Sequence, residues 1–269
     1  MARLCTENAT LAYSDTAVIC RDVTIQIPDG EFTVIVGPNG CGKSTLLKSL
    51  TRLITPVSGV TLLDGKSLHS QPTKQVARQV GLLPQGPVAP DGIRVIDLVS
   101  RGRYPHQSLL RPWSPEDERA VSAAMDATGV RELSGRFVDE LSGGQRQRVW
   151  MAVALAQNTP ILLLDEPTTY LDVRHQLELL ELCRELNLRD GYTLVAVLHD
   201  LNQAARYADN IIALKEGEVV AVGPPADVIT ESLVREVFGV EARVITDPES
   251  GSPLMIPRWG SGVTAGVGS

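Results

Sequence analysis

The chain has 269 residues, 43% of them hydrophobic and 21% charged, and a formal net charge of −7. These values are typical of a globular protein with a substantial core. The negative charge and an aromatic content of 4% argue against a nucleic-acid partner, which favours basic surfaces and stacking rings. No apolar run approaches the roughly 20 residues of a membrane helix and no secretory signal is recognised, so we expect a cytosolic chain that does not span a membrane.

The N-terminal part predicts β-strands. Apolar and polar residues alternate over 4–13 and 23–27, a Pro-Asp-Gly turn follows, and residues 32–36 form a short apolar run. After one loop, residues 45–50 begin an amphipathic helix. The loop therefore connects a strand to a helix, which is the setting that a phosphate-binding loop requires.

The loop itself fits the pattern G-x-x-x-x-G-K-[S/T]. It consists of Gly37, Pro38, Asn39, Gly40, Cys41, Gly42, Lys43, Ser44 and Thr45. Its glycines allow backbone N–H groups to turn toward phosphate oxygens, and the helix start adds a positive dipole. We expect Lys43 to reach the β- and γ-phosphates and the Ser44 hydroxyl to bind Mg²⁺. The alternative is a glycine-rich turn without a ligand, but such a turn does not explain why Lys-Ser-Thr follows the glycines.

The four cysteines lack paired or metal-ligand spacing, and we expect them to be free thiols: Cys5, Cys20, Cys41 and Cys183. Cys41 stands among inward-pointing N–H groups at a helix start, a place that lowers the pKa of a thiol. Cys41 is therefore predicted to be the most reactive cysteine and to be protected by Mg-ATP.

The next segments change from strands to helices. Residues 59–65 and 80–83 predict short strands, the second running into Gln85. From 86 to 157 the pattern is mostly helical, most clearly over 97–101, over 115–128 with its Ser-Pro-Glu-Asp start, and over 146–157. Before the last of these helices stands Leu-Ser-Gly-Gly-Gln. Its residues Ser142, Gly143, Gly144 and Gln145 predict a second anion-binding helix start.

The final third alternates strands and helices, which predicts βαβ units. The expected strands are 161–164, 193–198 and 211–214, and the helices between them are 173–189 and 201–207. The first strand ends in Asp165 and Glu166, and the second ends in His199. Ligands bind at such strand ends in α/β sheets. Solvated charges and a structural histidine are the alternatives; His69, His106 and His175 are expected on the surface, without a catalytic role.

These motifs, in this order after a phosphate loop, resemble the ATP-binding subunits of ABC transporters from about Tyr13 to about Gly239. The resemblance implies an α/β P-loop NTPase fold: an ABC ATPase domain with a RecA-like core, an antiparallel β subdomain and an inserted helical subdomain. We expect this domain over 1–240, with its core at 1–85 and 158–240 and its helical insertion at 86–157. Residues 241–257 are expected to form a small extension with a strand pair, and 258–269 a disordered tail.

The resemblance also implies roles within one ATP site. Glu166 is the expected general base, Asp165 a Mg²⁺ ligand, and His199 a contact to the γ-phosphate. Gln85 is expected to reach Mg²⁺ and the attacking water, and Tyr13 to stack on adenine. A polar turn residue and a core tyrosine are the alternatives for the last two.

The anion-binding helix start at Ser142 to Gln145, called the second cradle below, is implied by the resemblance to serve a different ATP. Two copies of the chain would meet head to tail and sandwich two ATP molecules. Ser142 to Gln145 and Asp172 would then act on the partner's nucleotide. Asp172 can equally be the N-cap of the helix that follows it, and both roles are compatible.

Flanking residues resemble the ATPases of ferric-siderophore importers, with haem and cobalamin importers as near relatives. They are Gly40-Cys41-Gly42, residues 103–106, 168–172, 175–176 and 199–209. Expected partners are a membrane permease and, indirectly, a periplasmic or lipoprotein substrate-binding protein, with the chain peripheral on the cytoplasmic face of the membrane. Rival classes are a soluble non-transport ABC protein, an exporter ATPase and a non-catalytic nucleotide sensor.

Overall fold

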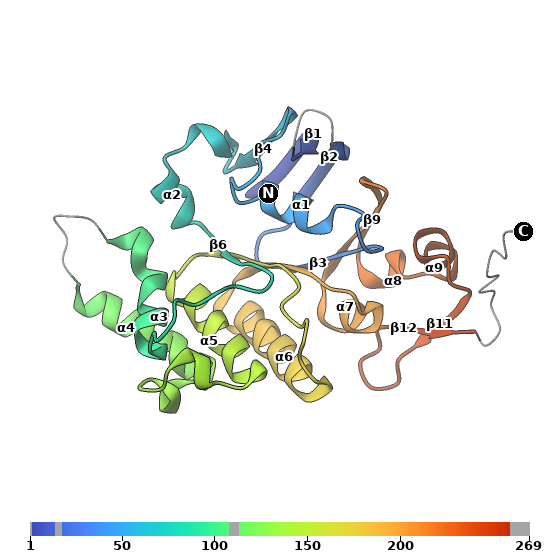
Figure 1. Cartoon of the computed structure of the whole chain (residues 1–269). Helices are drawn as coiled ribbons and strands as arrows, with labels where there is room; N and C mark the ends of the chain where they lie inside the picture. Colours follow the sequence, from blue (N-terminus) through green and yellow to red (C-terminus); the bar gives the residue numbers. More distant parts are fainter. Residues whose placement is uncertain (1, 14–17, 108–112, 259–269) are drawn as a thin grey trace, which may run out of the picture.

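The computed structural model describes residues 2–13, 18–107 and 113–258. A four-stranded antiparallel sheet lies along one side of the molecule (Figure 1, top). Its order is β2-β1-β4-β5, formed by β1 (Leu4–Ala12), β2 (Val18–Ile27), β4 (Ser58–Leu63) and β5 (Lys66–Ser67).

A six-stranded sheet forms the centre and sets the position of the site. Its order is β10-β9-β3-β8-β7-β6, formed by β3 (Phe32–Val36), β6 (Val80–Leu83), β7 (Ile161–Leu164), β8 (Thr193–Val197), β9 (Asn210–Lys215) and β10 (Glu218–Gly223). Only β10 pairs antiparallel. In the parallel register Leu83 lies opposite Leu164, and Leu164 opposite Ala196. The carboxyl ends of these strands therefore share one edge.

The central strands are apolar on both faces because both faces are covered. On one face, Val34, Leu164 and Ala196 pack into a core shared with α5 (Gly143–Ala156), α6 (Val173–Asp190) and α7 (Leu201–Tyr207). On the other face, Ile35 and Val197 pack with α1 (Lys43–Ser49) and the antiparallel sheet. Figure 1 shows α1 between the two sheets and α5 to α7 beneath the central one.

Most of the predicted helical region lies beside the sheet (Figure 1, lower left) and shares a hydrophobic core with it. Its elements are α3 (Val95–Ser100), α4 (Pro115–Ala127) and the short 3₁₀ segments η2 (Arg101–His106), η3 (Arg131–Leu133) and η4 (Val138–Glu140). The Ser114 cap and Pro115 begin α4 as expected, with Asp117 completing a capping box. Arg103 of η2 is buried, donates to Asp117 Oδ1 at 2.9 Å and to the Ala156 carbonyl at 2.9 Å, and so joins η2, α4 and α5.

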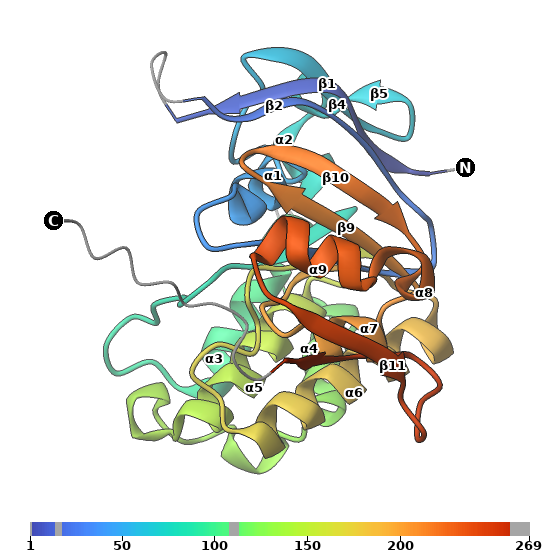
Figure 2. The same cartoon turned by 90° about the vertical axis from the view of Figure 1, so that its right-hand side faces the viewer.

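The last described elements lie on the opposite side of the central sheet. There lie α8 (Pro225–Val228), α9 (Glu231–Phe238), and the antiparallel pair β11 (Ala242–Thr246) and β12 (Pro253–Pro257), as Figure 2 shows. The Asn202 side chain, in the first turn of α7, donates to the Met255 carbonyl at 3.1 Å and accepts from the Met255 N–H at 2.7 Å. These two bonds attach the strand pair to the core.

The structure bears out the predicted strand pair and central strands, and it adds elements that the sequence did not predict: η1 (Leu68–Ser70), α2 (Thr73–Ala77), α8, α9 and β10. Helix α5 starts at Gly143, three residues before the expected Arg146. The expected disorder of the tail concerns residues that, apart from Arg258, lie outside the described part. Within the described part, no helix is long and apolar enough to cross a membrane.

The buried ion pair of the helical region predicts a large stability effect. Burial alone would raise the pKa of Asp117, but hydrogen bonds from Ser114 and Arg103 outweigh it and hold that pKa at about 2. Asp117→Asn leaves the Arg103 charge buried without a counter-charge, and we expect the free energy of unfolding to fall by about 3–5 kcal/mol in urea titrations at pH 7.

The pH dependence has a definite sign. The pKa of Asp117 in the folded state lies below its unfolded value of about 3.9. The contribution of Asp117 to the free energy of unfolding is therefore complete above that pH and is lost as pH falls toward 2. Asp126→Asn, which removes an exposed partner of Arg131 on the same helix, is the control and should change little. Equal effects of the two substitutions would contradict the assignment.

Candidate active site

The phosphate loop leaves the central strand β3 and requires glycine at two points. Gly37 has φ 154°, and a Cβ there would lie 2.3 Å from the Leu214 carbonyl oxygen. Gly42 has φ 105°, and a Cβ there would lie 2.6 Å from Cys20 Sγ. These approaches exclude any side chain. The loop can therefore fold closely over the sheet edge and start α1.

The buried Lys43 holds the loop together from within. Its Nζ donates to the carbonyls of Gly37 and Pro38, both at 2.9 Å. The ammonium thus lies under the loop, where it can exchange carbonyl partners for phosphate oxygens.

Asp165, at the end of β7, faces the start of α1. Ser44 Oγ donates to Asp165 Oδ1 at 2.7 Å, while Lys48 Nζ lies 3.9 Å from Oδ2. Oδ2 is buried and has no hydrogen-bond partner among the described residues. Burial raises the pKa of Asp165, against the opposing effects of Ser44 and Lys48. A buried carboxylate with one oxygen unsatisfied, beside a hydroxyl, is a donor set that suits a hard divalent cation.

Glu166 collects three donors on a single oxygen. Its Oε2 accepts from Gln85 Nε2 at 2.6 Å and from Thr169 Oγ1 at 3.1 Å, and it lies 2.9 Å from His199 Nε2. The backbone of Glu166 is left-handed, with φ 50°. The structure thus brings Gln85, Glu166 and His199 together from three separate strand ends. Thr169 was not predicted as a site residue.

A pocket of about 470 Å³ opens over the loop, a size suited to a small molecule. It is lined by Tyr13, Ile19, Asn39, Gly40, Gly42, Lys43, Ser44, Thr45, Gln85, Glu166 and His199. Gly37, Pro38 and Cys41 belong to the loop but do not line this pocket. Ile19 was not predicted; it lies on β2, far along the chain from the loop.

Tyr13 stands at the edge of the pocket rather than in the core. It is 62% exposed, and its hydroxyl lies 3.3 Å from Thr45 Oγ1. An exposed ring beside the phosphate loop can stack on a flat ligand, so the core alternative for Tyr13 does not hold.

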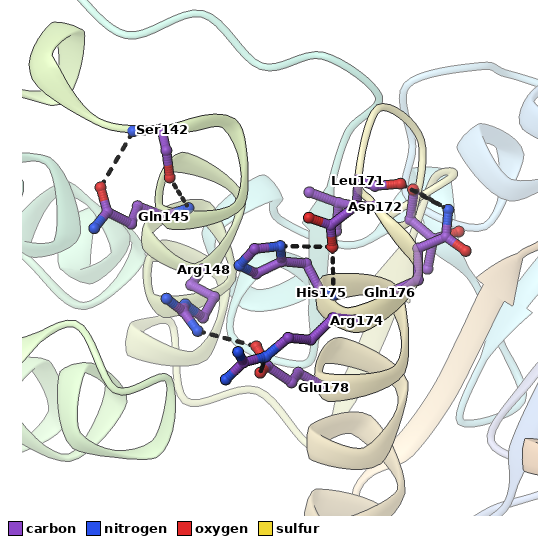
Figure 3. Close-up of polar contacts among 10 residues, drawn as sticks. Ser142, Gln145, Arg148, Leu171, Asp172, Arg174, His175, Gln176 and Glu178 are labelled. Carbon is purple, nitrogen blue, oxygen red and sulfur yellow. Dashed lines mark hydrogen bonds and ion pairs between the residues drawn. The ribbon is translucent and has the colours of Figure 1, made fainter.

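Figure 3 shows the second cradle, at the start of α5, beside the first turn of α6. Ser142 Oγ accepts from the Gln145 N–H at 3.3 Å, and Gln145 Oε1 accepts from the Ser142 N–H at 3.2 Å. Asp172 Oδ1 accepts from the His175 N–H at 2.9 Å, so Asp172 is the N-cap of α6. None of these residues lines the pocket of its own chain.

The prediction that Cys41 has a lowered thiol pKa is wrong. The residue is buried, and burial raises the pKa of Cys41 despite Lys43 and the loop N–H groups. Its Sγ faces Gly37, where a Cβ would lie 2.7 Å away. Local position at a helix start favours the thiolate, but packing under the loop removes the water that would stabilise it.

Comparison with known proteins identifies the fold and the motifs together. Residues 20–169 match the ABC transporter family model. The chain belongs to the ABC transporter family. It is 54% identical over 257 residues to the ferric enterobactin transport ATP-binding protein FepC of Escherichia coli K12, covering 96% of this chain and 94% of that protein. As a member of this family, it is an ATP-binding subunit with ATPase activity.

Two solved ABC structures extend the comparison to three dimensions. One, described as an inward-facing metal-chelate type ABC transporter, superposes with a TM-score of 0.83 at 26% identity and covers 97% of this chain and 99% of that one. The other is the dimeric ATP-binding cassette MJ0796 bound to ADP and Pi, with a TM-score of 0.72 at 29% identity, covering 82% and 98%. The ABC ATPase fold is thereby established.

No group of three or more His, Cys, Asp or Glu side chains within the described residues is arranged to hold a metal ion. Glu166 is the acidic residue among those that line the pocket, and Asp165 lies beside it in the chain, bonded to the pocket residue Ser44.

The corrected environment of Cys41 predicts slow alkylation. With iodoacetamide at pH 8, the partly exposed Cys5 should react before the buried Cys41; burial raises the thiol pKa of both residues, so the difference in exposure sets the order. Peptide mapping over time measures both rates. If Cys41 reacted first, and Mg-ATP slowed it, the side chain would face the nucleotide after all.

Proposed function

We propose that this chain is the ATP-hydrolysing subunit of an importer of ferric siderophores. The observation that carries the hydrolytic part is the cluster on Glu166 Oε2, where Gln85, Thr169 and His199 converge at the mouth of the phosphate loop. A carboxylate held in one position beside a phosphate cradle suits a general base.

In this proposal each residue has a defined task. Lys43 exchanges the loop carbonyls for β- and γ-phosphate oxygens. Glu166 accepts a proton from water while the water oxygen attacks the γ-phosphorus. The bond between the γ-phosphorus and the oxygen that bridges it to the β-phosphate breaks, which releases ADP and inorganic phosphate. His199 and Gln85 hold Glu166 and the γ-phosphate in register, and Tyr13 stacks on adenine.

Mg²⁺ fits the site through Ser44 and Asp165, with Gln85 nearby, because Asp165 offers a buried oxygen that no described residue satisfies. When bound, it would neutralise charge on the phosphate oxygens. Asp165 is held by Ser44 in a position to accept it.

A second copy of the chain would complete the site. Ser142, Gly143 and Asp172 are exposed and lie outside their own pocket, and they are flanked by exposed apolar side chains, Tyr170 at 92% and Val173 at 71%. Such side chains favour burial in an interface. Ser142 to Gln145 and Asp172 would then contact the partner's ATP in a two-fold dimer. The dimeric state of MJ0796 supports this arrangement.

The transported solute is inferred from likeness rather than from a residue of this chain. The resemblance to FepC, a ferric enterobactin transport ATP-binding protein, supports siderophore import. The chain would attach to the cytoplasmic face of the membrane by contacting a permease, and a substrate-binding protein would deliver the solute. Val88 suits the permease contact because it is an apolar side chain that is 88% exposed and stands three residues beyond Gln85.

Glu166→Gln tests the general base. The amide keeps the shape of the side chain but cannot accept the proton, so turnover should fall by about 10²–10⁴-fold while ATP still binds. Phosphate release measures turnover, and size-exclusion chromatography should show an accumulated ATP-bound dimer. Glu216→Gln is a matched control, since Glu216 also has φ 50° but lies outside the pocket. Full turnover in Glu166→Gln would remove Glu166 from this role.

Uptake assays test which solute the importer transports. A strain lacking this chain should lose accumulation of radioactive iron from at least one ferric siderophore, and the wild-type chain should restore it while the Glu166→Gln chain does not. Cobalamin and haem uptake should stay normal. Loss of either of those, with iron uptake intact, would assign the chain to a related importer and leave the ATPase mechanism unchanged.

A further inference from the structure

His175 lies between the two elements that are proposed to face the partner's ATP. It stands in the first turn of α6, and its Nδ1 lies 2.8 Å from Asp172 Oδ1, the same oxygen that accepts the His175 backbone N–H. Asp172 itself is 67% exposed, whereas the His175 side chain is 32% exposed. The expected surface position of His175 is thus only partly correct.

The opposite side of the His175 ring faces the start of α5. A Cβ placed on Gly144 would lie 2.8 Å from His175 Cδ2, 3.0 Å from Cγ and 3.1 Å from Nε2. The ring therefore packs where only the hydrogen of a glycine fits. Figure 3 shows the imidazole between the two helices, with its Nδ1 toward Asp172.

A second bridge lies further along the same two helices. Arg148 Nη1 of α5 lies 3.2 Å from Glu178 Oε2 of α6, and Arg174 Nε lies 2.8 Å from Glu178 Oε1. These groups are at least a third exposed, so each contributes little to a fixed geometry. The packed ring of His175 is the contact that can set the spacing of the two helix starts.

We propose that His175 is a positioning residue for the partner's ATP site. By packing on Gly144 and bonding to Asp172, it fixes the Ser142–Gly144 cradle and the Asp172 carboxylate as one rigid surface. This inference rests on the proposed dimer. His175 does not touch the nucleotide, and its effect reaches hydrolysis through the two elements that it connects.

The two contacts can be separated by substitution. His175→Phe keeps a ring against Gly144 but loses the Nδ1 bond to Asp172. His175→Asn keeps a short polar group near Asp172 but removes the ring atoms that face Gly144. In both, the backbone N–H still caps α6 through Asp172. Arg174→Ala, one residue away and exposed, is the matched control.

Steady-state ATPase assays on the full chain give the first readout. Each His175 variant should lower kcat by about 10–100-fold, the cost of misplacing catalytic groups by about an ångström, while the affinity of the free chain for ATP stays unchanged. Arg174→Ala should keep the wild-type kcat. Wild-type kcat in both His175 variants would overturn the proposal.

Mixed dimers show on which site His175 acts. Lys43→Ala loses the lysine of its own phosphate loop, and Gly143→Asp is expected to spoil only the cradle, because a Cβ at Gly143 meets no neighbouring atom within 4 Å. Mixing these two chains should restore about a quarter of wild-type activity, since half of the dimers then hold one intact composite site. His175→Ala mixed with Lys43→Ala should restore the same share.

The outcomes separate this inference from the proposed function. Recovery in the Gly143→Asp mixture without recovery in the His175→Ala mixture would place the role of His175 in its own site and overturn the inference, provided that His175→Ala still binds ATP. No recovery in the Gly143→Asp mixture would overturn the dimer arrangement itself, and the inference with it. Recovery in both supports the role of His175 in the partner's site.

Discussion

The parallel pairing of β6, β7, β8 and β3 is the constraint on which the site depends. Parallel neighbours end at the same edge, so residues 81 positions apart in the chain are brought within hydrogen-bonding distance. Gln85 and Glu166 follow adjacent strands and meet at 2.6 Å. The covered, apolar faces of the sheet make this edge rigid, and the polar residues can gather only where the strands stop.

That rigidity permits a strained backbone at the proposed general base. Glu166 has φ 50°, a conformation that costs a non-glycine residue of order 1–3 kcal/mol and persists only where the surroundings impose it. Here β7 holds one side of the turn, and Thr169 holds the side chain from the other. The left-handed turn points the carboxylate back toward Gln85 and His199 instead of into solvent, where its charge would be screened.

Much of this could be predicted because each central strand is a continuous apolar run that ends abruptly in polar residues. Local patterns could not predict Ile19, which reaches the pocket only because β2 folds over α1. Thr169 gave no signal because a threonine in a turn is common. Cys41 was mispredicted because the local helix start favours a thiolate, whereas its burial depends on the position of Gly37. For each of these residues the environment depends on tertiary packing, which the local sequence does not reveal.

The first turn of α6 connects both halves of the proposed mechanism through adjacent residues. His175 faces the cradle on α5, while Gln176 Nε2 donates to the Leu171 carbonyl at 2.9 Å and Gln176 Oε1 accepts from Gln203 at 2.9 Å. Gln203 lies in the first turn of α7, just beyond His199. The first turn of α6 thus contacts two regions. One is the start of α7, next to His199 of its own site, and the other is the Ser142–Gly144 cradle that is proposed to face the partner. In the proposed dimer, a displacement of α6 would change both together, so this one helix would link the two sites mechanically.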